Sequence, residues 1–398
     1  MNTKYKSTVF ACYRGYITQA IIVNLTPLFF VIFQEQYNVS FVMLGNIVLL
    51  NFVTQLSTDA ASIGFIGKIG YRAAALIAHA LSALGLILLG VMPLYLPLVP
   101  SVFVATFIFA VGGGLLEVIV SPIIDSIPGE AKESSMSLLH SFYCWGQVGV
   151  ILITTLILKC VGNRMWNIIP VLWAAVPIYN LIAFLKVPIR PPVPESKRTP
   201  IRMLLKSKVF LVVLLLMTCS GAAELGVSQW SSLFMEKALG VPKAVGDIFG
   251  PCLFGITMGI GRTVYGIYGH KIRMSQVLFI SALLSVISYL MIALCENVLL
   301  SFLGCALCGL SVSIMWPGVL SIAAATFTSG GAAMFGMMAL FGDIGCSLGP
   351  WLIGLISGTA GKGESFSSLR MGILVAAIFP VIMISGIIYF NLKRKKTN

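Results

Sequence analysis

The sequence predicts an all-α membrane protein with twelve transmembrane helices in two pseudo-symmetric six-helix halves. Three observations lead to this fold class. Of the 398 residues, 58% are apolar and 10% are charged, whereas roughly a quarter of the residues in soluble proteins are charged. The apolar residues form runs long enough to cross about 30 Å of hydrocarbon. Short sequence features of the first half also recur about 200 residues later.

Each span requires about 20 mainly apolar residues. Two uncharged stretches are too long for one helix, and we divide the first near Pro93, Pro97 and Pro100 and the second at 328–331. The predicted spans are 9–33, 41–63, 73–92, 99–126, 136–159, 166–186, 209–235, 244–267, 275–294, 298–326, 332–358 and 370–391.

Most of the 26 Lys and Arg residues fall in alternate connections between the spans and at the two ends of the chain. Because cytoplasmic loops are enriched in these residues, we expect both termini in the cytoplasm and the protein in the cytoplasmic (plasma) membrane. The proline-rich, basic stretch 188–208 is predicted to be a cytoplasmic linker. It divides an N-terminal half, 1–187, from a C-terminal half, 209–398.

Composition and motifs exclude several classes of function. The net charge of +13 lies in short loops rather than in a polar domain, which argues against nucleic-acid binding. Cys305 and Cys308 form the only CxxC, without partners at metal-ligand spacing, so no metal, disulfide or cofactor is expected. There is no HExxH and no phosphate-binding GxxxxGK[ST] motif, so neither a membrane enzyme nor ATP-driven transport is supported.

An internal repeat supports the two halves. Gly67–Arg72 after the second span aligns with Gly266–Lys271 after the eighth, and Asn24 aligns with Glu224 at an offset of 200. Trp145–Gly149 aligns in the same way with Phe341–Gly345. A duplicated six-helix unit is the architecture of carriers whose substrate site is central.

Several segments resemble the major facilitator superfamily, and within it the fucose permease-like sugar symporters. The fourth span holds GGGLLEVIVSP, with Glu117 five residues before Pro122, which is similar to the family's Gly-rich helix. The segments 138–146, 221–230 and 309–318 resemble the family's helices 5, 7 and 10. The resemblance covers essentially the whole chain and implies the major facilitator fold and a sugar:proton symporter.

The sequence departs from the family at two places. Lys68, Gly70 and Arg72 match the superfamily's signature between helices 2 and 3, but Gly67 stands where an acid is usual. The first span carries Gln19 and Asn24 and no carboxylate, whereas related sugar–proton symporters often have an acid there. Other acids would then supply any second titrating group.

Charged residues inside a bilayer are costly, by about 2.5–3.5 kcal/mol on insertion scales, and by default they mark functional sites. We expect proton coupling at Glu117, Glu224 and Asp343, whereas a structural hydrogen bond is the alternative for each. Asp343 could instead pair with Arg262. The expected gating residues are Asp59, Lys68, Arg72 and Arg262.

Amides, hydroxyls and aromatic rings suit a polar ligand such as a sugar, because they donate and accept hydrogen bonds or stack on a ring. Asn51, Gln55 and Asp59 follow one another at helical spacing and so share one helix face. The same residues could simply join helices. The predicted substrate-binding residues are Gln19, Asn24, Asn51, Gln55, His140, Tyr143, Gln147, Trp230 and Trp316. His79 is expected to be structural.

Together these observations predict a secondary active transporter that carries a small polar solute, a monosaccharide or related sugar, by alternating access with proton coupling. The alternatives are sodium coupling, uncoupled transport, export of amphipathic compounds and, outside the transporter class, a membrane receptor. The expected partners are the solute, the proton and the lipid bilayer. A monomer is expected, since this fold needs no second subunit to form its pathway.

Overall fold

The computed structural model describes residues 5–125, 127, 132–189, 201–268, 274–327, 331–359 and 366–394. Within them, twelve helical segments are long and apolar enough to cross a membrane, and no strand occurs. The spans are Lys6–Tyr37, Phe41–Ser62, Ile69–Leu94, Leu98–Ser121, Leu139–Val161, Ile168–Lys186, Lys208–Leu239, Lys243–Tyr265, Met274–Leu294, Val298–Ala323, Gly336–Thr359 and Ser367–Leu392. The predicted fold class is confirmed.

The chain folds into two compact units. Unit 1 comprises Met1–Val39 and Leu50–Pro194, and unit 2 comprises Ser40–Leu49 and Glu195–Asn398. The division after Pro194 falls inside the stretch 188–208. The assignment of Ser40–Leu49, the start of the second span, to unit 2 was not expected from the sequence.

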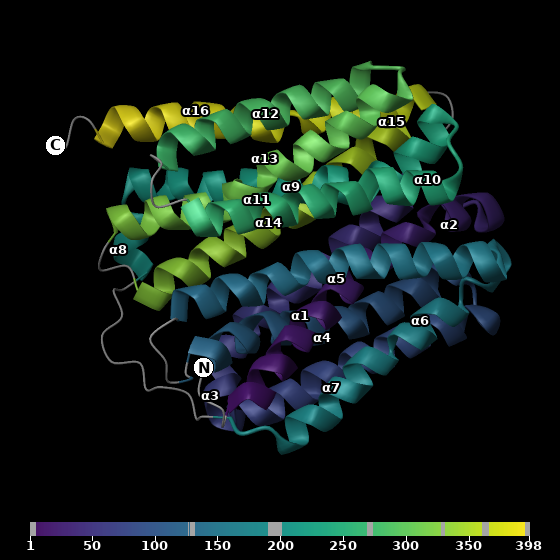
Figure 1. Cartoon of the computed structure of the whole chain (residues 1–398), viewed down its shortest axis with the longest axis horizontal. Coiled ribbons are helices and arrows are strands. Elements are labelled where there is room, and N and C mark those ends of the chain that lie inside the picture. Colours follow the sequence, from purple (N-terminus) through teal and green to yellow (C-terminus); the bar gives the residue numbers. More distant parts are fainter. Residues whose placement is uncertain are drawn as a thin grey trace. The chain divides into compact units, whose positions relative to one another are not determined.

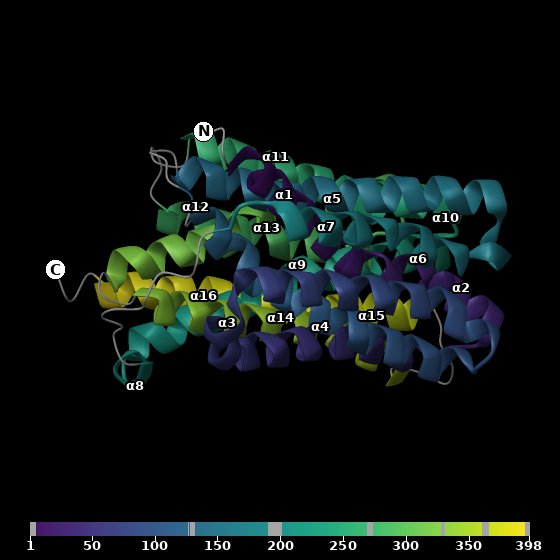
Figure 2. The same ribbon diagram turned by 90° about the horizontal axis from the view of Figure 1, so that it is seen from below.

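Unit 1 is built from long helices that pack side by side (Figure 1). Its elements are α1 (Lys6–Asn24), η2 (Thr26–Phe29), α2 (Phe30–Tyr37), α3 (Phe41–Val91, from Leu50 on), η3 (Met92–Leu94), α4 (Leu98–Asp125), α5 (Lys132–Val161), η4 (Asn163–Met165), α6 (Ile168–Trp173) and α7 (Ala175–Lys186). Both views show α5 running along α1, and α4 also contacts both of these helices (Figure 2). Apolar side chains such as Cys12, Leu116 and Ile119 are buried in the core of these helices.

In unit 1, two helical segments continue beyond the ends predicted from the sequence. Pro27 lies in a 3₁₀ turn that joins α1 to α2, so the first span is longer than 9–33. α3 contains both the second and the third span and is interrupted only at Gly70, whose φ is 79° and ψ is 160°. Glycine has no Cβ and adopts this backbone conformation without steric cost.

Unit 2 contains α8 (Ile201–Leu205), α9 (Lys208–Leu239), α10 (Lys243–Asp247), η5 (Ile248–Cys252), α11 (Leu253–Tyr268), α12 (Met274–Leu294), α13 (Val298–Thr326), α14 (Gly331–Thr359), α15 (Phe366–Ala376) and α16 (Ile378–Arg394). η5 is a π-helical turn around Pro251, which has no backbone N–H to donate. α9 packs closely on α14, since a Cβ on Gly345 would lie 1.9 Å from the backbone oxygen of Thr218.

Candidate functional site

Unit 1 has a hydrogen-bonded network of polar side chains in its interior. Gln19 of α1 donates from Nε2 to Oε1 of Gln55 of α3 over 2.6 Å and, more weakly, to Glu117 of α4 over 3.4 Å. Gln55 in turn donates to Oδ1 of Asn51 over 2.9 Å. Gln19, Asn51 and Gln55 are each buried. Three spans therefore meet at four side chains that the sequence singled out.

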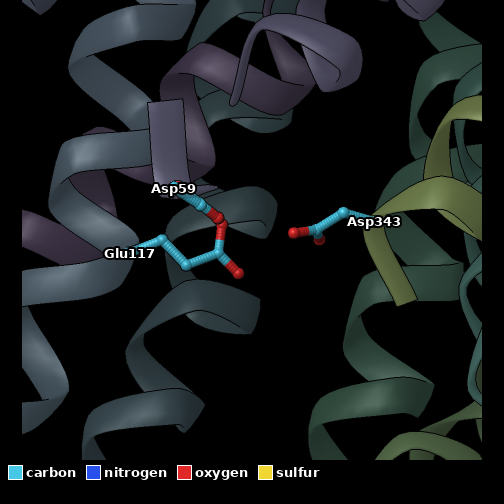
Figure 3. Close-up of side chains that lie close together, drawn as sticks. All are labelled: Asp59, Glu117 and Asp343. Atoms are coloured by element: carbon cyan, nitrogen blue, oxygen red, sulfur yellow. The ribbon is translucent and has the colours of Figure 1, made fainter. Parts of the chain in front are cut away.

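Glu117 also lies beside a second carboxylate. An oxygen of Glu117 and an oxygen of Asp59 lie within 4.8 Å of each other. Figure 3 shows these two carboxyl groups turned toward one another from α4 and α3. Asp59 is one turn beyond Gln55 on the same face of α3, as the spacing predicts. The structure thus brings together one acid predicted for proton coupling and one predicted for gating.

Glycines of α4 allow this close approach. A Cβ on Gly114 would lie 2.8 Å from Oδ1 of Asp59 and 2.8 Å from the backbone oxygen of Gln55. A Cβ on Gly112 would lie 2.4 Å from Oγ of Ser82. The Gly-rich run that resembles the family pattern therefore has a packing role: it lets α4 touch α3 at the level of the network.

The other candidates of unit 1 lie on α5 and at the end of α1. Asn24 is buried and donates to the backbone oxygen of Ala20 over 2.9 Å and to the Tyr143 hydroxyl over 3.4 Å. His140 is exposed and its ring meets that of Tyr16 edge-on at 5.1 Å. Gln147 is buried one turn beyond Tyr143. Asn24 and Tyr143 thus form a second polar contact, between α1 and α5.

Unit 2 contains an intramembrane ion pair. Nη2 of Arg262 in α11 lies 3.3 Å and 3.2 Å from the two carboxylate oxygens of Glu224 in α9. Their side chains are 19% and 9% exposed. The sequence led us to consider Glu224 and Arg262 separately, with Asp343 as an alternative partner of Arg262. The structure places Glu224 beside Arg262. Asp343 is buried in α14, where its backbone oxygen accepts from Ser347.

The two tryptophan candidates of unit 2 pack against protein. Trp230 is fully buried, donates from Nε1 to the backbone oxygen of Pro350 over 2.9 Å and meets Phe41 edge-on. Trp316 is half-buried, and its ring lies over Gly342, where a Cβ would be 2.3 Å from it. These contacts give both rings a structural role, while substrate stacking by them stays a prediction.

Arg72, predicted as a gating residue, binds the carboxyl end of α7. Its guanidinium donates to the backbone oxygens of Phe184, Leu185 and Val187 over 2.6–2.7 Å. The last carbonyls of a helix have no partner within the helix, so these bonds fix the end of α7 to the start of the third span. The side chain of Lys68, the neighbouring gating candidate, lies outside the described part of the structure.

The sequence analysis missed a third buried network in unit 1. Asn180 of α7 accepts from Nε of Arg14 over 3.0 Å and contacts Nε2 of His79 at 2.7 Å. The other ring nitrogen of His79 lies 2.7 Å from the backbone oxygen of Ala75. His79 is therefore held on both sides, consistent with the structural role expected for it. Asn180 could have been noticed as an isolated amide in an apolar span.

Several solved transporter structures have a fold similar to that of this chain. Similar solved structures include a bacterial homologue of the human lysosomal transporter Spinster, with 14% identity, a TM-score of 0.78 and coverage of 98% of each chain. They also include a D-xylose-proton symporter, with 14% identity, a TM-score of 0.76 and coverage of 95% of this chain and 97% of that one. The fucose:proton symporter of E. coli has 15% identity, a TM-score of 0.67 and coverage of 97% and 99%. At such identities the likeness concerns the fold alone.

Among curated proteins, none matches this sequence significantly. The family model described as Major Facilitator Superfamily, however, matches residues 14–350. That match includes both units, the network of unit 1 and the ion pair of unit 2. With its twelve apolar spans, the chain belongs to the Major Facilitator Superfamily and is a multi-pass membrane transporter.

Proposed function

We propose that this protein is a proton-coupled symporter of a monosaccharide or related polar solute. The observation that carries the proposal is the network of Gln19, Gln55 and Asn51 with Glu117 and Asp59 inside unit 1. Polar side chains in a membrane span are costly and persist where they serve a ligand or an ion. This network combines amides, which suit hydroxyl groups, with carboxylates, which can hold a proton.

The carboxylate pair is the proposed proton site. Two full negative charges within 4.8 Å repel each other by roughly 3 kcal/mol at an effective dielectric constant of about 20. A proton shared by Asp59 and Glu117 removes this repulsion, and its release restores it. Glu117 is also bonded to Gln19. Loading and release of the proton would therefore change the hydrogen bonds of the same network.

The amides are the proposed solute site. Oε1 of Gln19 is buried and has no hydrogen-bond partner among the described residues. An unsatisfied buried acceptor is unfavourable, and a donor from the solute would satisfy it. Sugar hydroxyls can donate to Gln19 and accept from amide N–H groups. Asn24 with Tyr143 offers a second pair of such groups in the same unit. The D-xylose-proton and fucose:proton symporters show that this fold can carry such a solute.

Glu224 is the less favourable proton carrier because Arg262 already compensates its charge. The proposal gives this pair the task of holding α9 to α11 during transport. Asp343, buried in α14, is retained as a second coupling residue. Asp59 and Arg262 keep their proposed gating roles together with Arg72, and we place the protein in the cytoplasmic membrane with both termini inside.

The function can be tested with the full chain in proteoliposomes. A thermal-shift screen of monosaccharides, nucleosides and amphipathic compounds first identifies the ligand, because a bound solute stabilises the folded state. Uptake of that ligand is then measured with an inwardly directed proton gradient, with a sodium gradient, and with neither. We expect concentrative sugar uptake only with the proton gradient, together with acidification of the lumen when sugar is added.

The other outcomes are equally informative. Uptake driven by sodium alone would replace the proton with Na⁺ at Asp59 and Glu117. Uptake that never exceeds equilibrium would make the protein an uncoupled carrier. Stabilisation by nucleosides or amphipathic compounds and by no sugar would contradict the proposed substrate class.

A further inference from the structure

Arg14 places a positive charge inside the first membrane span without an anion beside it. It lies on α1, eight residues or about 12 Å from the start of the span at Lys6. Its side chain is half-buried, and in the described part of the chain it forms no salt bridge. A charged side chain within a span is costly and by default has a function that involves a partner.

Arginines in comparable positions of the described structure have partners. Arg262 binds the carboxylate of Glu224, and Arg370 donates to two backbone oxygens at the end of α12. Arg14 donates only from Nε, to Oδ1 of Asn180 on α7 over 3.0 Å. Its two terminal nitrogens have no hydrogen-bond acceptor among the described residues. A guanidinium has five N–H donors, so four donors of Arg14 are available to an anion.

The guanidinium of Arg14 lies at a surface of exposed apolar side chains. The ring of Tyr179 on α7 lies 5.1 Å from Cζ of Arg14, and Tyr179 is 61% exposed. Phe10, one turn before Arg14 on α1, is 46% exposed, and Ile182, about one turn beyond Tyr179 on α7, is 48% exposed. An amphipathic ligand could therefore reach Arg14 from outside the core of unit 1.

Two lysines lie at the ends of the same two spans. Lys6 is two turns before Arg14 on α1, and Lys186 is two turns after Tyr179 on α7, so each shares a helix face with its partner. Both lysines are exposed, and the ends of a span lie where hydrocarbon gives way to lipid headgroups. Neither α1 nor the stretch 168–194 contains Asp or Glu. This surface therefore complements a negative charge.

We propose that Arg14 and Tyr179 form a binding site for one anionic phospholipid. The phosphate accepts hydrogen bonds from the terminal nitrogens of Arg14, whose fork matches phosphate geometry. Lys6 and Lys186 complete the site on the water side, and an acyl chain lies along the exposed apolar side chains. The ligand is a lipid rather than a soluble anion because Arg14 lies within the span, where the bilayer accommodates it by local thinning. The site is independent of the solute and proton sites proposed for unit 1.

The test uses the full chain in nanodiscs of phosphatidylcholine with a minor fraction of phosphatidylglycerol. Native mass spectrometry after mild detergent release counts the lipids that stay bound. We expect the unchanged chain to retain one phosphatidylglycerol in preference to phosphatidylcholine. Arg14→Gln should reduce this retention on the order of tenfold, because the amide carries no charge for the phosphate.

Further variants separate charge from packing. Arg14→Lys keeps the charge but loses the planar fork and the bond from Nε to Asn180, so retention should fall by about threefold or less. Tyr179→Leu removes the ring over which the guanidinium lies and should reduce retention by about two- to fivefold. Arg164→Gln removes the same charge from an exposed position near the other end of the sixth span. This control should retain the lipid fully, and far-ultraviolet circular dichroism verifies that every variant is folded.

Four results would overturn the proposal. The first is equal retention of phosphatidylcholine and phosphatidylglycerol by the unchanged chain. The second is undiminished retention by folded Arg14→Gln. The third is an equal loss in Arg14→Gln and Arg14→Lys, which would mean that packing at this position and not its charge holds the lipid. The fourth is displacement by inorganic phosphate or glycerol phosphate as effective as that by the intact lipid, which would make this a site for a soluble anion.

Discussion

The polar centres of the two units are built on different charge arrangements. In unit 1, the amide of Gln19 donates to Glu117, and an oxygen of Glu117 lies within 4.8 Å of an oxygen of Asp59. In unit 2, Glu224 faces the guanidinium of Arg262. An ion pair favours a fixed charge state, whereas two close carboxylates favour exchange of a proton. Under the proposed function, unit 1 would therefore exchange the proton and the ion pair of unit 2 would hold α9 to α11.

The strongest test of this difference is Glu117→Gln. The amide keeps the shape and the hydrogen bond to Gln19 but cannot release a proton, so we expect proton-driven concentrative uptake to fall by about 100-fold. Counterflow exchange of solute should persist. Both are measured in proteoliposomes. Glu296→Gln is the control, since Glu296 is exposed in the connection between α12 and α13. Full concentrative uptake by Glu117→Gln would remove the proton site from unit 1.

Arg262→Gln tests the cohesive role of the ion pair. It leaves the Glu224 carboxylate without its cation, which for a mostly buried pair costs about 3–5 kcal/mol. The free energy of unfolding and the melting temperature in detergent should fall accordingly. The double variant Glu224→Gln, Arg262→Gln should recover most of that loss, because no charge is then stranded. Equal losses in the single and double variants would show that the loss does not come from an uncompensated Glu224 charge.

Gly114→Ala tests the close approach that unit 1 requires. The new methyl group would lie 2.8 Å from an oxygen of Asp59 and from the backbone of Gln55. We expect destabilisation of about 1–3 kcal/mol by overpacking, with weaker solute binding. Gly149→Ala in α5 is the matched control, because a Cβ there would meet nothing within 4 Å. It should be neutral or stabilising by up to about 1 kcal/mol. Similar thermal shifts for both variants would contradict the packing argument.

The smallest effect is expected for Trp230→Phe. Phenylalanine keeps an aromatic ring but loses the N–H that bonds Pro350, so stability should fall by about 1 kcal/mol. If Trp230 only packs, the Kd of the solute stays unchanged. A weakened Kd with unchanged stability would instead support the substrate-binding role predicted from the sequence. Thermal unfolding with and without solute measures both quantities on one sample.

The twelve spans could be predicted because hydrocarbon thickness imposes a length of apolar sequence that composition reveals directly. The exact breaks could not. The first span, predicted to end at 33, extends to Tyr37 and contains a 3₁₀ turn at Thr26–Phe29. The π turn at η5 was likewise not foreseen. Such adjustments depend on how neighbouring helices satisfy the freed backbone groups, which local sequence does not specify.

For the candidate site, the sequence predicted which residues share one helix face but not which residues of different helices contact one another. Helical spacing placed Asn51, Gln55 and Asp59 on one face, as the structure has them. The meeting of that face with Gln19 and Glu117 depends on the level at which three helices pack, and glycines of α4 set that level. The pairing of Glu224 with Arg262 joins residues 38 positions apart. No periodicity links them, so only the tertiary structure could reveal it.

The single interruption of α3 at Gly70 has a consequence of its own. A Cβ at Gly70 would meet nothing within 4 Å, yet the φ of 79° at Gly70 disfavours L residues that carry a side chain. A side chain at Gly70 would therefore have enough space, and only the backbone conformation disfavours an L residue. A D-alanine introduced by chemical ligation should fit at Gly70, whereas the mirror-image L-alanine should strain the turn by about 1–2 kcal/mol. The connection between the second and third spans thus restricts the stereochemistry of the residue at position 70 and not the size of its side chain.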